Sequence, residues 1–202
     1  MGMILRRKEF PQPSIDCLGK TESGQISWTM GLLLTLLLAV YLFASLQTQR
    51  FRTASLYMED ALAASNLASA VVDYEEYGIS HVIRIADPER SYGVYQNALR
   101  GNLNLDENFR GNAGGVICGN VTIENYTVYN VDGLTVSIHE FTPEGETIRE
   151  ERLGAAKAPN GLLIEFTSIY SEISFPLEVI HGVEVIARKG KLVDIAGNRE
   201  GG

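Results

Sequence analysis

The residues best suited to chemistry in this sequence are three histidines and two cysteines. His81, His139 and His181 lie far apart in the chain, without the HxH or HxxxH spacing that places two imidazoles on one metal ion. A pair of Cys118 and His139 would suggest a thiol nucleophile, but no local signature of a thiol enzyme accompanies it. The sequence contains no GxSxG, P-loop or SxxK pattern. We therefore predict no catalytic residues.

One short run has the alternating oxygen ligands of a calcium loop. It reads NLNLDEN over residues 102–108. The sixth position of such a loop requires Gly and the twelfth requires Glu, whereas this chain has Glu107 and Ala113 there. The glycine-rich residues 111–115 lead into a predicted strand, so they offer no helix N-terminus for a phosphate. We predict no metal and no cofactor.

The composition indicates a folded chain and excludes several partners. Of 202 residues, 45% are hydrophobic and 21% are charged, and the net charge is −8. This hydrophobic content is too high for a disordered chain. The residues after 49 carry 13 basic and 22 acidic side chains, without the Lys/Arg cluster that binds phosphates, so we expect no nucleic acid partner. Cys17 and Cys118 flank a long apolar run, so we expect no disulfide between them.

That apolar run is the strongest signal in the sequence. Residues 28–46 read WTMGLLLTLLLAVYLFASL, with eight Leu and no charge. As a helix these residues rise about 28 Å, close to the hydrocarbon thickness of about 30 Å. The core helix of a soluble protein would need a polar face, which this run lacks. We therefore predict one membrane span, with the lipid bilayer as a partner.

The flanking residues predict the orientation of the span. Its apolar core is longer than the roughly 7–15 residues of a secretory signal, and no small-x-small cleavage site follows it. Four basic residues precede the span, whereas only Arg50 and Arg52 follow it closely. By the positive-inside rule, we expect a single-pass membrane protein with a cytoplasmic N-terminus and an extracytoplasmic C-terminal domain.

The helical pattern continues beyond the span, because neither Pro nor Gly occurs between residues 47 and 77. Small or apolar residues recur there at spacings of three and four: Phe51, Ala54, Met58, Ala61, Ser65, Ala68 and Val72. A polar line runs beside them: Arg52, Glu59, Asn66 and Asp73. We predict one helix over residues 27–73, about 70 Å long. It suits either a plain stalk or bitopic dimer, or a pilin-like helix whose second half packs on a globular domain.

The residues at the start of this helix carry a family resemblance. The segment SGQISWTM at residues 23–30, the apolar helix and the run MEDALAASNLASAVV resemble the N-terminal region of Tad-type minor pilins, the TadE-like pseudopilins of bacterial type IV filament systems. The resemblance covers about residues 20–75, roughly a quarter of the chain. It implies a leader cut after Gly24 by a prepilin peptidase, with Gln25 as the first mature residue. It also implies other pilin-like subunits and an assembly platform as partners.

The fifth mature position departs from the family pattern. Members carry Glu there, whereas this chain carries Thr29. A Glu in hydrocarbon is costly unless it is paired, so its absence favours an accessory subunit that stays easily in the membrane. Gly19 is an alternative cleavage site, which would put Glu22 at the third position and Gly24 at the fifth.

The remainder of the chain predicts a β-rich domain. Residues 74–85 begin extended, with His81 in a strand, and Asp87-Pro88 opens a helix that ends near Gly101. Residues 116–130 alternate as a strand, with a possible bulge at residues 124–125. Hairpin turns follow at Asp132-Gly133 and at residues 143–145. Acidic residues of the second hairpin suggest either a solvated face or a contact for a basic partner: Glu144, Glu146, Glu150 and Glu151.

Further strands are predicted over residues 161–170 and 173–180. The second should lie at an edge because it contains Pro176. His181-Gly182 marks a turn, and a last hairpin is expected around Lys189-Gly190.

These patterns predict an α+β fold, in which a long N-terminal helix packs on a mostly antiparallel sheet with one extra helix. The expected parts are a leader-like cytoplasmic segment (1–26), a membrane-spanning and extended helix (27–74), an exported α+β domain (75–195) and a flexible tail (196–202). Together with the resemblance, they predict a non-catalytic, membrane-anchored, pilin-like component of a type IV, Tad-like filament or secretion apparatus. The alternative is a bitopic scaffold or sensor of the cell envelope, with an extracytoplasmic ligand-binding domain.

Overall fold

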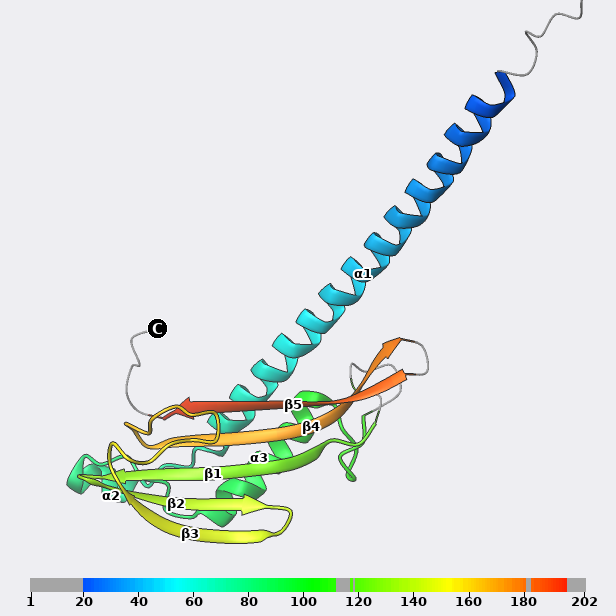
Figure 1. The fold of residues 1–202 in the computed structure, drawn as a ribbon. Helices are drawn as coiled ribbons and strands as arrows, with labels where there is room; N and C mark the ends of the chain where they lie inside the picture. Colours follow the sequence, from blue (N-terminus) through cyan, green and yellow to red (C-terminus); the bar gives the residue numbers. More distant parts are fainter. Residues whose placement is uncertain (1–19, 112–116, 118, 181–182, 196–202) are drawn as a thin grey trace, which may run out of the picture. The chain divides into compact units, whose positions relative to one another are not determined.

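The structure is a computed structural model that describes residues 20–111, 117, 119–180 and 183–195, with the backbone alone at residues 20–26, 178–180 and 183. It divides into two compact units, Met1–Gln49 and Arg50–Gly202, which are described separately. The helices are α1 (Lys20–Ser69), α2 (Tyr74–Ser80) and α3 (Pro88–Leu103), and five strands follow them (Figure 1). The predicted α+β architecture with a long N-terminal helix is confirmed.

The first unit contains the apolar part of α1. Every side chain at residues 27–44 is exposed. Of the helices that the structure describes, α1 alone is long and apolar enough, by length and composition, to cross a membrane. A helix that exposes apolar side chains on all sides has no stable place in water.

The second unit is built on one antiparallel sheet with the strand order β3-β2-β1-β4-β5. The strands are β1 (Thr122–Asp132), β2 (Thr135–Thr142), β3 (Gly145–Arg152), β4 (Ser168–Ile180) and β5 (Val183–Asp194). The predicted turns at Asp132-Gly133 and at residues 143–145 join β1 to β2 and β2 to β3, and Gly133 and Gly145 both have positive φ angles. The expected bulge in β1 is present, since its register with β4 shifts between Ile123 and Asn125.

Alternate side chains of the strands face two separate apolar clusters. The larger cluster joins the sheet to α1 and α3, and includes Met58, Leu62, Tyr95, Leu99, Tyr126, Val128, Ile169 and Ile173. The smaller cluster lies where the β3–β4 connection packs on the sheet, and includes Tyr129, Ile138, Ala156, Ala158, Ile164 and Tyr170. Both faces of the central strands are thus partly covered.

The segment after α1 differs from the prediction. α1 ends at Ser69, and residues 74–80 form the short helix α2 in place of an extended segment. The cause is Asp73, whose carboxylate accepts hydrogen bonds from the backbone N–H groups of Glu75 and Glu76 and so caps α2. His81 therefore lies at the C-terminal cap of a helix, with φ of 57°, and not in a strand.

The start of α3 at Asp87-Pro88 is confirmed, with the Asp87 carboxylate accepting from the N–H of Arg90. Its end near Gly101 was predicted too early. The helix continues to Leu103, and Asn104 closes it in the left-handed conformation that asparagine tolerates.

The strands predicted over residues 161–170 and 173–180 are in fact one strand, β4, which begins at Ser168 and has β1 and β5 as neighbours. The prediction that Pro176 marks an edge strand is therefore wrong. The register explains how proline is accommodated: β1 pairs with β4 only as far as Ser174, and beyond this residue β5 is the one paired neighbour among the described residues.

The last hairpin expected around Lys189-Gly190 is also wrong, because β5 runs through both residues. A side chain at Gly190 would collide with the phenol group of Tyr170 on β4. Glycine here permits close packing between neighbouring strands and does not mark a turn. The predicted turn at His181-Gly182 and the tail 196–202 lie outside the described residues.

Candidate functional site

Two parts of α1 hold the candidate functional residues: the apolar stretch in the first unit, and the part that packs on the sheet in the second unit. Thr29 lies in the apolar stretch, where its side chain is exposed. The backbone of Gly24 and Gln25 lies within α1, near its start. The structure thus places the candidate cleavage site and the position matching the family Glu on one helix.

One face of α1 in the second unit is buried, and we call it the docking face. Its members are Ala54, Met58, Ala61, Leu62, Ser65, Asn66 and Ser69. The predicted stripe is confirmed from Ala54 to Ser65, but Ala68 is exposed and Asn66, predicted on the polar side, is fully buried. The alanines bring the helix backbone near the strands, and Met58 and Leu62 join the apolar cluster that contains Ile169 and Ile173.

Asn66 ties the docking face to the backbone of the sheet. Its Nδ2 donates to the carbonyl oxygen of Lys191 on β5 at 3.0 Å and, more weakly, to that of Ile169 on β4 at 3.5 Å. A neighbouring contact links α1 to α3, since Asn102 Nδ2 donates to Ser65 Oγ at 2.9 Å. Because buried polar groups are costly unless hydrogen-bonded, these contacts favour one position of the helix on the sheet.

A three-residue ion cluster borders the docking face. Glu59 on α1 lies 2.6 Å from Lys191 Nζ and 3.2 Å from Lys189 Nζ, both on β5. Lys189 also donates to Ser55 Oγ at 3.2 Å. Hydrogen bonds from Lys191, and then from Lys189, lower the pKa of the Glu59 carboxyl. The three side chains are about one-third exposed, so the cluster contributes to helix position more than to stability.

A buried hydroxyl network fixes the C-terminal end of α1. Ser91 Oγ of α3 donates to the Ser69 carbonyl oxygen at 2.6 Å, and Tyr126 OH of β1 donates to Ser69 Oγ at 2.9 Å. Ser91 Oγ and Tyr126 OH are 2.6 Å apart. Burial raises the pKa of Tyr126 to about 12, so the phenol remains protonated at neutral pH. The network joins three elements at the point where α1 ends.

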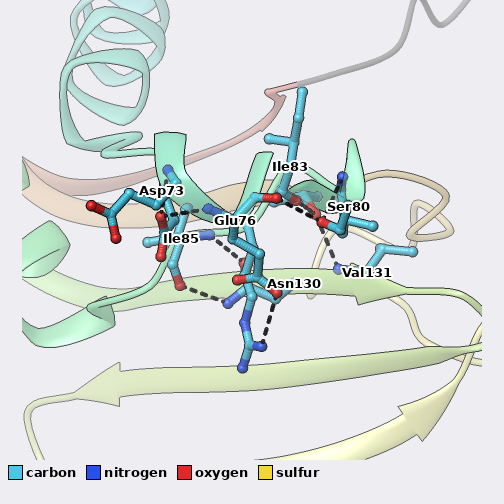
Figure 2. Close-up of polar contacts among 11 residues, drawn as sticks. Asp73, Glu76, Ser80, Ile83, Ile85, Asn130 and Val131 are labelled. Carbon is cyan, nitrogen blue, oxygen red and sulfur yellow. Dashed lines mark hydrogen bonds and ion pairs between the residues drawn. The ribbon is translucent and has the colours of Figure 1, made fainter. Parts of the chain in front are cut away.

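Two side chains hold the segment that follows α2 against the sheet (Figure 2). Asn130 of β1 accepts from the N–H of Ile85 at 2.8 Å and donates to its carbonyl at 2.9 Å. Thr167 donates to the carbonyl of Ile83 at 2.8 Å and accepts from the N–H of Val131 at 3.0 Å. These side chains replace the pairing that a further strand would supply, so the segment stays attached to the end of β1.

Of the histidines and cysteines first considered for chemistry, the structure describes only His81 and His139, and it does not bring these two together. His81 is exposed and makes an edge contact with the Tyr77 ring, whereas His139 is on β2, 4.0 Å from a carboxylate oxygen of Glu146. Cys17, Cys118 and His181 lie outside the described residues. Among the residues that the structure describes, no three His, Cys, Asp or Glu side chains are grouped to hold a metal ion.

The run at residues 102–108 has structural roles. Asn102 binds Ser65, and one carboxylate oxygen of Asp106 accepts from the N–H groups of Asn108 and Arg110 at 2.8 and 2.9 Å. This oxygen therefore shapes its own loop, in the manner of an Asx turn.

Comparisons of the chain with protein-family models, with curated proteins and with solved structures found no match. In the first unit α1 has an exposed apolar stretch, and in the second unit it has a buried face that packs on the sheet with polar contacts around it. The buried hydrogen-bonding roles of Asn66, Ser91 and Tyr126 were not predicted, because the sequence alone does not distinguish a buried polar side chain from a solvated one. The signal that pointed toward them was the run of small residues around Ser65 and Ser69.

Proposed function

We propose that this protein is a non-catalytic, membrane-anchored, pilin-like component of a type IV, Tad-like filament or secretion apparatus. One observation carries the proposal: a single helix, α1, has an apolar exposed stretch followed by a docking face that packs on an antiparallel sheet. In this role the apolar stretch is held in the bilayer, and the second unit, which contains the docked half of α1, is a folded domain outside the cytoplasm.

The outer side of α1 supplies the surface for neighbouring subunits in this proposal. In the second unit, Leu56 and Leu67 are 62% and 56% exposed, and Ala64 lies between them on the exposed side. Small and aliphatic residues allow close helix packing both in lipid and between protein subunits. Lateral contact through this side would bury leucines that water otherwise surrounds.

Processing by a prepilin peptidase is part of the proposal. A cut after Gly24 would leave Gln25 as the mature N-terminus and Thr29 as the fifth residue. Without a carboxylate at this position there is no buried charge to be neutralised during assembly, so the subunit is suited to an accessory place more than to the bulk of a filament. The basic leader would remain on the cytoplasmic side, consistent with the positive-inside rule.

Deletion and complementation test the proposed function. Loss of the gene should reduce surface filaments or the secretion that depends on them, and the wild-type chain should restore both. Leu67→Asp should fail to restore them while still folding and entering the membrane, since it alters only the exposed side of α1. Leu134→Asp is the matched control, because Leu134 is 69% exposed in the turn between β1 and β2 and is not part of α1. Unchanged filaments and secretion after deletion would refute the proposal.

A second candidate is a scaffold or sensor of the cell envelope, and one observation favours it. The short helix α2 buries none of its residues, and it exposes Tyr74 and Ile79 by 81% and 86%. Such side chains suit a protein partner. If Ile79→Ser abolishes co-purification of an envelope protein while filaments persist in the deletion strain, the scaffold function replaces the pilin-like one.

A further inference from the structure

β3 is an edge strand whose outer side has no strand neighbour among the described residues. It is the last strand in the sheet order and pairs with β2 alone (Figure 1). All eight of its residues pair with β2 without a register shift, and none of them is proline. A regular edge of this kind can pair with an additional strand, because half of its backbone groups are left over.

The hydrogen bonds to β2 determine which backbone groups of β3 point outwards. The N–H of Leu153 donates to the carbonyl oxygen of Leu134 at 2.8 Å, so these two residues form a hydrogen-bonded pair that continues the register of the strands. Hydrogen-bonded pairs alternate along an antiparallel ladder. The odd-numbered residues of β3 therefore bond to β2, whereas the N–H and C=O groups of Glu146, Ile148 and Glu150 point to the free edge. This row of donors and acceptors extends over about 13 Å.

The same three residues give the edge an acidic character. Side chains alternate between the two faces of a strand, so Glu146, Ile148 and Glu150 lie on one face, and all three are exposed. On the other face, Arg149 forms ion pairs with two carboxylates at 3.0 and 3.3 Å. Within the described part of the chain, no Lys or Arg side chain forms an ion pair with Glu146 or Glu150. Two carboxylates thus flank the exposed Ile148 side chain.

The charges of β3 disfavour pairing with a second copy of itself. Only outward-pointing residues can exchange hydrogen bonds across a new pair, so two antiparallel β3 strands must place even-numbered residues opposite even-numbered ones. A pair centred on Ile148 puts Glu146 opposite Glu150 twice. A pair centred on Arg149 or on Glu150 puts that charge opposite its own copy. Because like charges directly opposite each other are destabilising, the edge is better suited to a different strand.

We propose that the β3 edge binds an extended segment of a partner protein as an additional strand, in which an apolar side chain lies between two basic ones at alternate positions. The backbone of the partner pairs with the outward N–H and C=O groups of Glu146, Ile148 and Glu150. Its basic side chains lie opposite the two carboxylates, and its apolar side chain lies opposite Ile148. The contact involves the second unit alone. It goes beyond the pilin-like function and does not depend on the membrane anchor.

Peptide binding to the full chain in detergent micelles tests this contact. The probe is the fluorescein-labelled peptide TKTVTKT, and binding is followed by fluorescence anisotropy. The peptide TETVTET reverses the charges. A third peptide has the sequence of the probe with an N-methyl group on valine, which removes one backbone donor and leaves the charge unchanged.

Two variants test the same pairing from the side of the protein. Ile148→Pro removes an outward N–H without removing a bond to β2, and proline is tolerated at such edge positions. Ile148→Thr is the matched control, because it keeps this N–H. Near-ultraviolet circular dichroism of the buried tyrosines shows whether both variants keep the fold, and the N-methylated peptide tests the pairing without any change to the protein.

The probe should bind the wild type. Charge reversal, N-methylation and Ile148→Pro should each weaken binding by about tenfold or more, whereas Ile148→Thr should stay within about threefold. In amide hydrogen exchange measured by nuclear magnetic resonance, the probe should slow exchange at Glu146, Ile148 and Glu150. Exchange at Arg149, whose amide already bonds to β2, should change little.

Three results would overturn the proposal. The first is a probe that does not bind the wild type. The second is equal binding of the N-methylated peptide, or binding without slower exchange at the outward amides, which would show a contact between charges alone. The third is slow exchange at these amides without peptide, increasing with protein concentration, which would assign the edge to a second copy of the chain.

Discussion

Removing the Met58 side chain gives the most direct measure of how firmly α1 is docked. Met58 has no exposed surface, and its neighbours on the docking face, Ala54 and Ala61, are too short to fill the space that a truncation would leave. Replacing a buried Met by Ala costs about 2–5 kcal/mol, and we expect about 3 kcal/mol for Met58→Ala because the site can collapse little. With a urea m-value of about 2 kcal/mol/M, the unfolding midpoint should fall by about 1.5 M.

The assay is urea unfolding of the full chain in detergent micelles, followed by near-ultraviolet circular dichroism. The signal comes from tyrosines that are buried in the second unit, among them Tyr95, Tyr126 and Tyr129. Leu56→Ala is the matched control, since Leu56 lies on the same helix with 62% of its surface exposed and should change stability by less than about 0.5 kcal/mol. Equal effects of the two substitutions would refute the docking of α1 through the Met58 side.

Three further predictions concern the polar contacts. Glu59→Gln should lower the free energy of unfolding at pH 7 by up to about 1 kcal/mol. Because the pKa of Glu59 in the folded state is lowered from 4.5, the difference between the two proteins should vanish as the pH falls through that lowered pKa. A difference that persists in acid would contradict the ion cluster. Burial raises the pKa of Tyr126 to about 12, so the phenol ionises first in the unfolded chain and the free energy of unfolding of the wild type should fall as the pH rises from 10 towards 12. Tyr126→Phe should lose less free energy of unfolding over this range. An equal loss in the two proteins would count against the buried network. Asn130→Ala should speed hydrogen exchange at the Ile85 amide, which Asn130 binds, and unchanged exchange would show that this side chain does not hold the segment.

Local signals predicted much of the fold correctly. The hairpin turns at Asp132-Gly133 and at residues 143–145, and the start of α3 at Asp87-Pro88, follow from backbone preferences of the residues themselves. The buried stripe of α1 was also predictable, because small and apolar residues that recur with the helical period of 3.6 form one face of the helix that packs against another element.

Errors arose where distant residues decide the structure. Lys189-Gly190 has the sequence of a turn, yet glycine lies there because the Tyr170 side chain on the neighbouring strand occupies the space of a Cβ. Pro176 is accommodated because β1 stops pairing at Ser174, which no property of β4 alone reveals. The helical spacing places Asn66 in line with charged residues of α1, as expected of a solvated side chain. Its amide nevertheless donates to carbonyl groups more than one hundred residues away in the sequence. Contacts of this kind depend on strand order, which the sequence pattern did not define.

The mature N-terminus tests the proposed pilin-like identity most directly. The protein should be isolated from membranes of cells that express a prepilin peptidase, and its N-terminal peptide should be measured by mass spectrometry. We expect a chain that begins at Gln25, with the leader removed after Gly24. A chain that retains residues 1–24 in cells where the same peptidase processes another pilin would contradict it.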